Sequence, residues 1–183
     1  MAYNIKDVFY LSTSATVSAT TAGTGSAQLD LSAYIDPIAR GRQKGTGLAI
    51  YKVHFSILDG DGKAVKVADT GVLTASMQAG LGVGDNATGT AFQIGTTTFN
   101  TNALNIATAD YYAPGATANH AGFYEMVMPS TEVPYVVVRD NACLVYGIRD
   151  NFTEDAVLSV RLECAQISLD QATLNQLLRT QTV

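Results

Sequence analysis

The stretch LAIYKVHFSIL, residues 48–58, alternates apolar and polar side chains over most of its length. Its odd-numbered residues from Tyr51 to Ile57 are apolar, and the residues between them are Lys52, His54 and Ser56. Successive side chains of a β-strand point to opposite faces, so a repeat of two residues is typical of a half-buried strand. The stretch therefore predicts a strand with one solvated face, which favours an antiparallel sheet.

A tight turn is predicted directly after this strand. The residues Asp59-Gly60-Asp61-Gly62 separate it from KAVKVA, residues 63–68, which also alternates. Asp-Gly pairs adopt the positive φ angles that short hairpin turns require. The sequence therefore predicts a tight hairpin between residues 48–58 and 63–68.

The same pattern recurs along most of the chain. AVLSVRLECA, residues 156–165, places leucine, valine and cysteine side chains on one face. Further strand candidates, separated by Gly, Pro, Asn and Asp clusters, are residues 7–11, 27–34, 71–79, 90–99, 103–109, 122–128, 135–140 and 143–149. Helical periodicity is nearly absent between them, so we expect an all-β protein of about eight to ten antiparallel strands.

The C-terminal residues have a helical pattern instead. SLDQATLNQLLRT, residues 168–180, has Ser168 and Gln171 at capping-box spacing and leucines on one face, which predicts a short helix on the β-core or on a neighbour. Two tracts with few bulky side chains, residues 12–26 and 80–90, predict loops or arms. The predicted organisation is an N-terminal strand and flexible arm over 1–26, a β-barrel over 27–168, and a C-terminal helix or tail over 169–183.

The composition favours protein contacts over nucleic-acid or membrane binding. The chain has 183 residues, a net charge of −5 and only 15% charged residues, which leaves an uncharged polar surface. Nucleic-acid binding requires clustered Lys and Arg, and Lys6 is the only basic residue among the first thirty. No apolar run approaches the roughly 20 residues of a membrane span, and no signal-peptide pattern opens the chain. We expect folding in a cytoplasm, without sequence-specific nucleic-acid binding or membrane insertion.

The segment IARGRQKGTG, residues 38–47, concentrates Arg40, Arg42 and Lys44 among glycines. A phosphate-binding P-loop needs GxxxxGK[ST] between a strand and a helix. Here Lys44 precedes Gly45 and a strand follows. We therefore interpret the segment as a subunit-contact loop.

No other pattern indicates catalysis. His54 and His120 are the only histidines, and neither has the short spacing to another ligand or nucleophile that metal or Cys-His sites require. Cys143 and Cys164 lie in apolar runs, which predicts buried, reduced thiols. The acids of RDNFTEDA predict a polar turn, with weak calcium binding as the alternative. We expect no enzyme activity, no catalytic residue, no metal and no cofactor.

Two pairs of aromatic residues lie next to expected loops. Tyr111-Tyr112 precede Ala-Pro, and Phe123-Tyr124 follow Gly122. The chain has no tryptophan and no basic residues interleaved with these tyrosines, which disfavours sugar binding and base stacking. The pairs are interpreted as loop anchors or interface residues, since a tyrosine combines an apolar body with a polar tip.

Two segments resemble a known family. DLSAYIDPIARGRQKGTGLAIYKVHFSIL, residues 30–58, is similar to the front half of the single jelly-roll capsid proteins of small tailless icosahedral viruses. EDAVLSVRLECAQISLD, residues 154–170, is similar to the last barrel strand of such coat proteins. The resemblance implies an antiparallel jelly-roll β-sandwich or barrel of about eight strands over residues 27–168, with a short C-terminal helix and no catalytic residue.

The function implied is that of a structural, self-assembling capsid protein, which forms an icosahedral shell through lateral subunit contacts. Partners are further copies in capsomers, with room for a second capsid or vertex protein, and the location is the virion after assembly in the host cytoplasm. Because a basic N-terminal arm is missing, genome charge is expected to be neutralised elsewhere. The candidate contact residues are Arg40, Arg42, Lys44, Asp150, Glu154, Asp155, Tyr111 and Tyr112.

Two alternatives stay open. The first is a β-sandwich binding module, such as an adhesin, fibre head or carbohydrate-binding domain, which uses the tyrosine-rich loops around residues 111–124. The second is a hydrolase or lyase on a β-barrel, which requires His, Asp and Glu side chains to converge.

Overall fold

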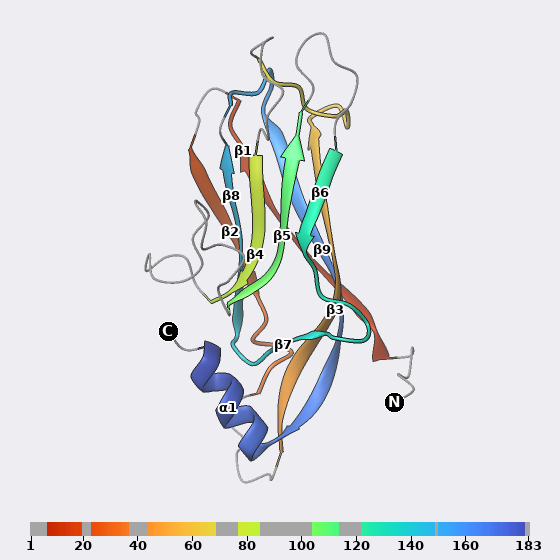
Figure 1. Ribbon diagram of the computed structural model, residues 1–183, viewed down its shortest axis with the longest axis vertical. Helices are drawn as coiled ribbons and strands as arrows, with labels where there is room; N and C mark the ends of the chain where they lie inside the picture. Colours follow the sequence, from red (N-terminus) through yellow and green to blue (C-terminus); the bar gives the residue numbers. More distant parts are fainter. Residues whose placement is uncertain are drawn as a thin grey trace.

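The computed structural model describes residues 7–19, 23–36, 44–68, 77–84, 104–113, 122–148 and 150–181. Two antiparallel β-sheets face each other, and one short helix lies at one end of the molecule (Figure 1). The prediction of an all-β chain with a short C-terminal helix is confirmed, and the two sheets are consistent with a β-sandwich. Neither sheet closes into a barrel within the described residues. The predicted strand 90–99 lies outside them.

The strands divide between a four-stranded and a five-stranded sheet. The four-stranded sheet has, in order, β1 (Phe9–Val17), β9 (Ala156–Asp170), β3 (Lys44–Asp59) and β7 (Tyr135–Val137). The five-stranded sheet has β2 (Thr24–Asp30), β8 (Asn141–Ile148), β4 (Met77–Val83), β5 (Asn105–Tyr112) and β6 (Gly122–Val127). The chain ends in helix α1 (Gln171–Gln181).

The long strands β3 and β9 pair along their whole lengths, from Lys44 opposite Asp170 to Asp59 opposite Ala156. Their register shifts between Ile50 and Lys52, where Tyr51 is the extra residue of a β-bulge. Beyond the bulge, the predicted alternation holds. At the bulge itself, the alternation fails: Tyr51 packs with Ala49 and Ala165 in a separate cluster, outside the core that contains Val53 and Ile57.

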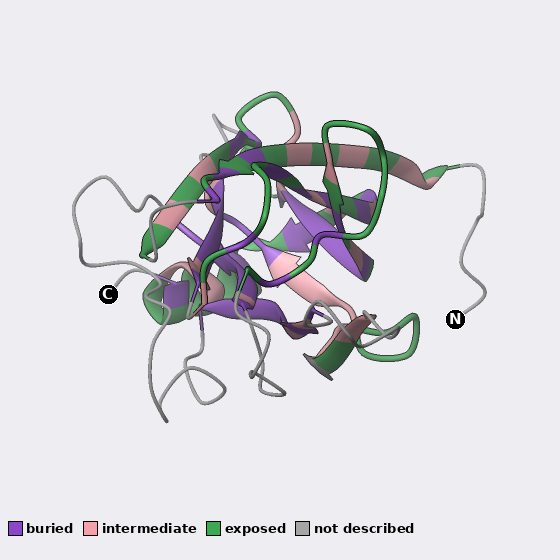
Figure 2. Cartoon of the chain, turned by 90° about the horizontal axis from the view of Figure 1, so that it is seen from above, coloured by how far each residue is buried: buried purple, intermediate pink, exposed green. Residues whose placement is uncertain are grey.

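The buried parts of the chain lie where the two sheets face each other (Figure 2). The core between them consists of apolar side chains from both sheets. Fully burying one such side chain stabilises the fold by about 1.5–3 kcal/mol. The largest fully buried side chains of this core are Leu31, Leu48, Ile50, Met77, Leu81, Ile106, Leu144, Leu158, Leu162 and Val17. This filled interior explains why period-two patterning dominates the sequence.

Two expected loops are strands in the structure. Residues 12–17, predicted as part of a loop or arm, belong to β1 and pair residue by residue with β9, and β2 begins at Thr24. Gly80 to Val83, predicted as a loop, are buried in the middle of the five-stranded sheet. The predictions are wrong there because backbone pairing does not require bulky side chains, and small ones pack closely where sheets approach.

The turn after β3 is confirmed, but the hairpin is wrong. Gly62 has φ of 78° and donates its N–H to the Asp59 carbonyl at 3.1 Å. The residues that follow leave the sheet, and Val67 forms an isolated bridge with Phe152. Since Val65 and Val67 are buried, their alternation reflects side chains that cover the end of the core.

Helix α1 begins after Asp170, whose Oδ1 accepts the Thr173 N–H at 2.7 Å. The predicted cap, Ser168, lies within β9 instead, because the strand continues to Asp170. Leu174 is fully buried against Leu169 and Val138, so the helix packs on its own chain. Its last residue, Gln181, accepts the Val138 N–H at 3.1 Å and donates to a carbonyl of β7, which covers that edge of the sheet.

Candidate functional site

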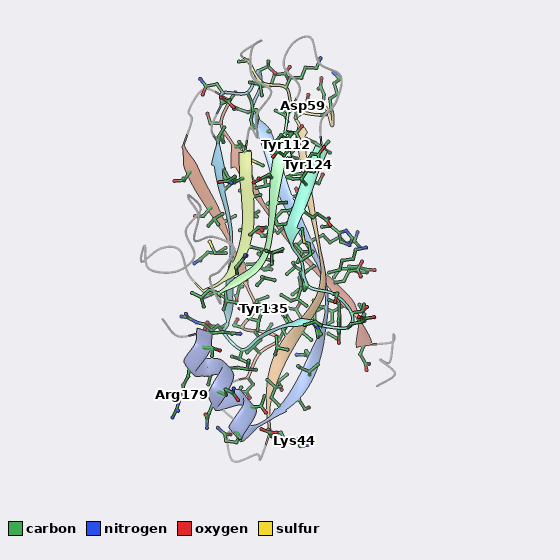
Figure 3. The ribbon with its side chains drawn as sticks, viewed as in Figure 1. Lys44, Asp59, Tyr112, Tyr124, Tyr135 and Arg179 are labelled. Atoms are coloured by element: carbon green, nitrogen blue, oxygen red, sulfur yellow. The ribbon has the colours of Figure 1, made fainter. Side chains whose placement is uncertain are left out.

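Of the three predicted basic contact residues, the structure describes Lys44, which lies at the helix end of the molecule (Figure 3). Arg40 and Arg42 are outside the described residues. Lys44 is exposed at the first position of β3 and faces Asp170 in the ladder with β9. Hydrogen bonds from Thr173, and to a smaller extent the charge of Lys44, lower the pKa of the Asp170 carboxyl.

The predicted acidic contact residues lie at the opposite end, and they differ in their surroundings. Asp155 Oδ1 accepts the Ala19 N–H at 2.7 Å, which ties the end of β1 to the start of β9. Asp150 has its Oδ2 atom buried, with no hydrogen-bond partner among the described residues. Glu154 is exposed. Of the three acids, Glu154 is therefore the one best placed for a contact with another molecule.

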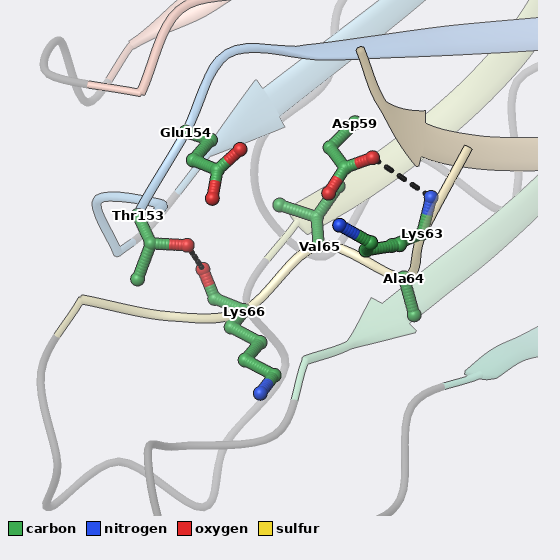
Figure 4. Close-up of a pocket in the computed structure, with 7 residues that line it drawn as sticks. All are labelled: Asp59, Lys63, Ala64, Val65, Lys66, Thr153 and Glu154. Atoms are coloured by element: carbon green, nitrogen blue, oxygen red, sulfur yellow. Dashed lines mark hydrogen bonds between the residues drawn. The ribbon is translucent and has the colours of Figure 1, made fainter. Parts of the chain in front are cut away.

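Glu154 borders a small surface hollow of about 150 Å³ (Figure 4). Asp59, on the other side, accepts the backbone N–H groups of Asp61 and Lys63 with one carboxylate oxygen. Lys63 Nζ forms an exposed ion pair with Asp61 at 2.9 Å. These bonds are those of a turn that stabilises itself. The remaining lining residues are Ala64, Val65, Lys66 and Thr153.

Lys44 and Glu154 cannot meet within one molecule. Lys44 begins β3 and Asp59, beside Glu154, ends it (Figure 3). The strand has 16 residues. At about 3.3 Å per residue its ends lie roughly 50 Å apart. Any ion pair between the basic segment and these acids therefore joins two molecules.

Tyr111 and Tyr112, which the sequence treated as a pair, have different environments. Tyr111 is 3% exposed and donates its hydroxyl to the Val65 carbonyl at 3.0 Å, so it anchors the segment after the turn. Burial raises the pKa of its hydroxyl. The loop-anchor interpretation of Tyr111 is confirmed, and its burial removes it from the candidate contact surface.

Tyr112 lies at the surface and contacts Tyr124 across the β5–β6 ladder (Figure 3). The ring centroids are 4.9 Å apart and the rings are nearly perpendicular, at 82°. Tyr124 is 66% exposed. The alternation of GFYEMV indicates this outward position, because Phe123 packs against the core.

The outer face of the four-stranded sheet carries a charged group that sequence reasoning missed. His54 Nε2 lies 2.9 Å from Glu163 Oε1, with both side chains partly exposed. The Arg161 guanidinium lies over the Tyr10 ring, 4.0 Å from its centroid. Strand register alone brings these residues together, since they are adjacent only across the β1–β9–β3 ladders.

The described residues were predicted to hold no metal site, and their His, Cys, Asp and Glu side chains are spread over the molecule. No group of three His, Cys, Asp or Glu side chains in this part of the chain is arranged to hold a metal ion. His120 lies outside the described residues. Cys143 and Cys164 are free and buried, as predicted, and burial raises the pKa of Cys164 to about 12. A thiol that remains protonated is a poor nucleophile.

Comparisons with protein-family models, with curated proteins and with solved structures found no match to this chain. Among the residues that the structure describes, no helix has the length and apolar character needed to cross a membrane.

Proposed function

We propose that this protein is a structural coat protein that assembles with further copies of itself into a closed viral shell. Its mechanism is association through lateral contacts, without turnover of a substrate. The observation that carries the proposal is the nested pairing of the strands, which supports a jelly roll.

The pairing proceeds from the chain ends inwards. β1 pairs with β9, β2 with β8, β3 with β7, and β4 with β5. Successive pairs alternate between the two sheets. A long ribbon of paired strands wrapped in this way is the arrangement of a jelly roll, and β6 then extends one sheet by an extra strand. Jelly rolls occur in capsid proteins, lectin domains and cupins, so the fold alone does not define the function. The interior and the surface of the molecule are needed to distinguish these classes.

The interior and the surface both favour a shell protein. The space between the described strands is filled by apolar side chains, whereas cupin-type chemistry needs polar ligands that converge there. On the outer face of the four-stranded sheet, the exposed Leu58 and Val157 lie opposite each other. Only 15% of the chain is charged, so contacts across such faces cost little desolvation.

The separation of charge supports contacts between copies. The basic segment with Arg40, Arg42 and Lys44 precedes one end of β3, and Glu154 lies at the other end. When the basic end of one copy contacts the acidic end of another, the pair still has one free basic end and one free acidic end. Further copies can therefore add, and the assembly closes when the rotation between copies allows it. In such a shell the protein resides in the virion, with a second capsid or vertex protein as a possible partner and genome charge neutralised elsewhere.

The test is the size distribution of the purified native protein. We expect discrete capsomers or shells in light scattering and negative-stain electron microscopy, over a range of salt and pH. Replacing Arg40, Arg42 and Lys44 with serine should weaken assembly while circular dichroism stays native. Lys66→Ser, at the other end of the molecule, is the matched control. A strict monomer under every condition counts against the proposal.

A second candidate, the β-sandwich binding module, is favoured by one observation. The partly exposed Tyr112 and the exposed Tyr124 form an aromatic pair on the outer face of the five-stranded sheet. Aromatic faces are common elements of carbohydrate sites. Glycan-array binding that is lost on Tyr124→Ala and kept on Tyr10→Ala would support the module over the shell.

A further inference from the structure

The outer surface of β5 and β6 carries three residues whose chemistry suits a cation. We call them the Tyr112–Tyr124 cluster: Asp110, Tyr112 and Tyr124. Asp110 is directly opposite Tyr124 in the ladder. Side chains directly opposite in an antiparallel pair have Cβ atoms about 4.5–5.5 Å apart. Because the Tyr111 side chain points into the core, Asp110 and Tyr112 share the outer face.

The acid of the cluster differs from most other acids at this end of the molecule. Asp59 and Asp155 accept backbone hydrogen bonds. Within the part of the chain that the structure describes, the carboxylate of Asp110 forms no ion pair and no hydrogen bond. A free carboxylate beside the exposed Tyr124 ring and the partly exposed Tyr112 ring combines a negative charge with ring faces, which attracts a cationic side chain.

We propose that the Tyr112–Tyr124 cluster binds the basic segment, residues 40–44, of a second copy of this chain. The inference rests on the proposed function and names the contact that joins neighbouring subunits. Charge complementarity supports it, because three of the 11 Lys and Arg residues fall within these five positions. Arginine suits such a site, since its planar guanidinium stacks on aromatic rings and pairs with carboxylates.

The chain already shows this chemistry once within a single molecule. The Arg161 guanidinium stacks over the exposed Tyr10 ring at 4.0 Å, on the outer face of the other sheet. An exposed cation–π contact of this kind contributes about 0.5–1 kcal/mol when isolated. The Tyr112–Tyr124 cluster has the ring faces without a described arginine.

The Tyr112–Tyr124 cluster and Lys44 lie at opposite ends of each molecule (Figure 3). The hydroxyl of Tyr111 bonds Val65, which places this end of β5 beside the segment that follows Asp59. Lys44 is at the other end of β3, which spans roughly 50 Å. The segment after Lys44 is strand, so the contact joins two copies. It is heterologous, and repeated contacts of this type build rings when the rotation between copies closes and open filaments when it does not.

The test measures proximity between two singly substituted full-length proteins. Gly122→Cys lies opposite Tyr112, and a Cβ at this glycine meets no atom within 4 Å. Gln43→Cys lies in the basic segment of the other protein. The two proteins are mixed under mild oxidation, and the rate of mixed disulfide dimer is measured on non-reducing gels. Gly60→Cys is the matched control, since it is an equally open glycine at the same end.

We expect the Gly122→Cys protein to cross-link to Gln43→Cys roughly tenfold faster than the Gly60→Cys protein does. Adding Tyr124→Ala or Asp110→Asn to Gly122→Cys should reduce the rate to that of the control. Adding Tyr10→Ala or Glu132→Gln, an exposed tyrosine and an exposed acid elsewhere, should leave it unchanged.

The outcomes separate the inference from the proposed function. Equal cross-linking rates for Gly122→Cys and Gly60→Cys overturn the inference, whether or not the native protein forms particles. Fast cross-linking that Tyr124→Ala and Asp110→Asn do not slow also overturns it, because the contact then does not use the cluster. Selective cross-linking by a native protein that forms only short oligomers supports the contact and counts against the shell.

Discussion

The attachment of α1 to the four-stranded sheet depends on one fit between a leucine and a glycine. Leu174 is 0% exposed. A Cβ placed on Gly45 would lie 2.7 Å from Leu174 Cδ2 and 3.1 Å from the Asp36 carbonyl oxygen. Gly45 therefore leaves the space that the leucine occupies. Leu174→Ala removes this side chain from the cluster with Val138 and Leu169, and we expect it to cost about 2–5 kcal/mol of stability.

Adding a side chain at Gly45 should also destabilise the protein. Gly45→Ala forces its new methyl group against Leu174 and the Asp36 carbonyl, and overpacking of this kind costs about 1–3 kcal/mol. In the double variant, the methyl group at position 45 enters the space that Leu174 vacates. We expect the double variant to be more stable than the sum of the single effects by about 1 kcal/mol or more. The Asp36 carbonyl stays in place, so relief is incomplete.

The assay is equilibrium urea unfolding, followed by far-UV circular dichroism and tyrosine fluorescence, since the chain has no tryptophan. Gly60→Ala with Leu174→Ala is the matched control, because a Cβ on Gly60 meets nothing within 4 Å. That pair should be additive within about 0.5 kcal/mol. Equal additivity for the Gly45 and Leu174 pair would refute the proposed fit and the packing of α1 derived from it.

Four further results follow from single interactions. Gln181→Ala should cost about 1–3 kcal/mol in urea unfolding, because it leaves buried backbone groups beside β7 without partners; an unchanged midpoint would contradict this. Tyr111→Phe should cost about 1 kcal/mol, since the Val65 carbonyl loses its donor, and a neutral effect would mean that water replaces it. Burial raises the pKa of Cys164 from 9.0 to about 12, so stability should fall as pH rises from 9 to 12, where only the unfolded thiol ionises. Unfolding measured at pH 8 and 11 should show a smaller fall for Cys164→Ala. Glu163→Gln should change stability by less than about 1 kcal/mol, as its pair with histidine is partly exposed, and a larger loss would show a coupled network.

Local patterns predicted the elements whose structure depends on neighbouring residues. The alternation of residues 53–58 and 156–165, the Asp-Gly turn and the C-terminal helix all follow from side-chain period and backbone preference. The helix cap was misplaced by two residues, at Ser168 in place of Asp170, because the spacing pattern cannot show where the preceding strand ends. Residues 12–17 of β1 were missed because their pairing with β9 stabilises small side chains that have no pattern of their own.

The candidate site was predicted less well, because its residues converge only through pairing. Asp155 is exposed, as expected of a surface acid, but the approach of Ala19 also makes it a backbone acceptor, which the sequence did not indicate. Tyr111 and Tyr112 are adjacent in sequence and point to opposite faces, so one is core and the other is surface. The register of β5 against β6 places Asp110 opposite Tyr124, and neither residue indicates the other in the sequence.

The sequence by itself determined that the chain forms amphipathic strands joined by tight turns, with a short helix at its end and little charge on its surface. These properties depend on contacts between residues a few positions apart, so they can be read from the order of side chains. Tertiary structure alone decided that the first strand pairs with the last, that the basic segment and the acids lie at opposite ends of β3, and that Gly45 receives Leu174. Pairing over such sequence distances is selected by the combined burial of both sheets, because the alternation of each strand identifies its buried face and leaves its partner undefined.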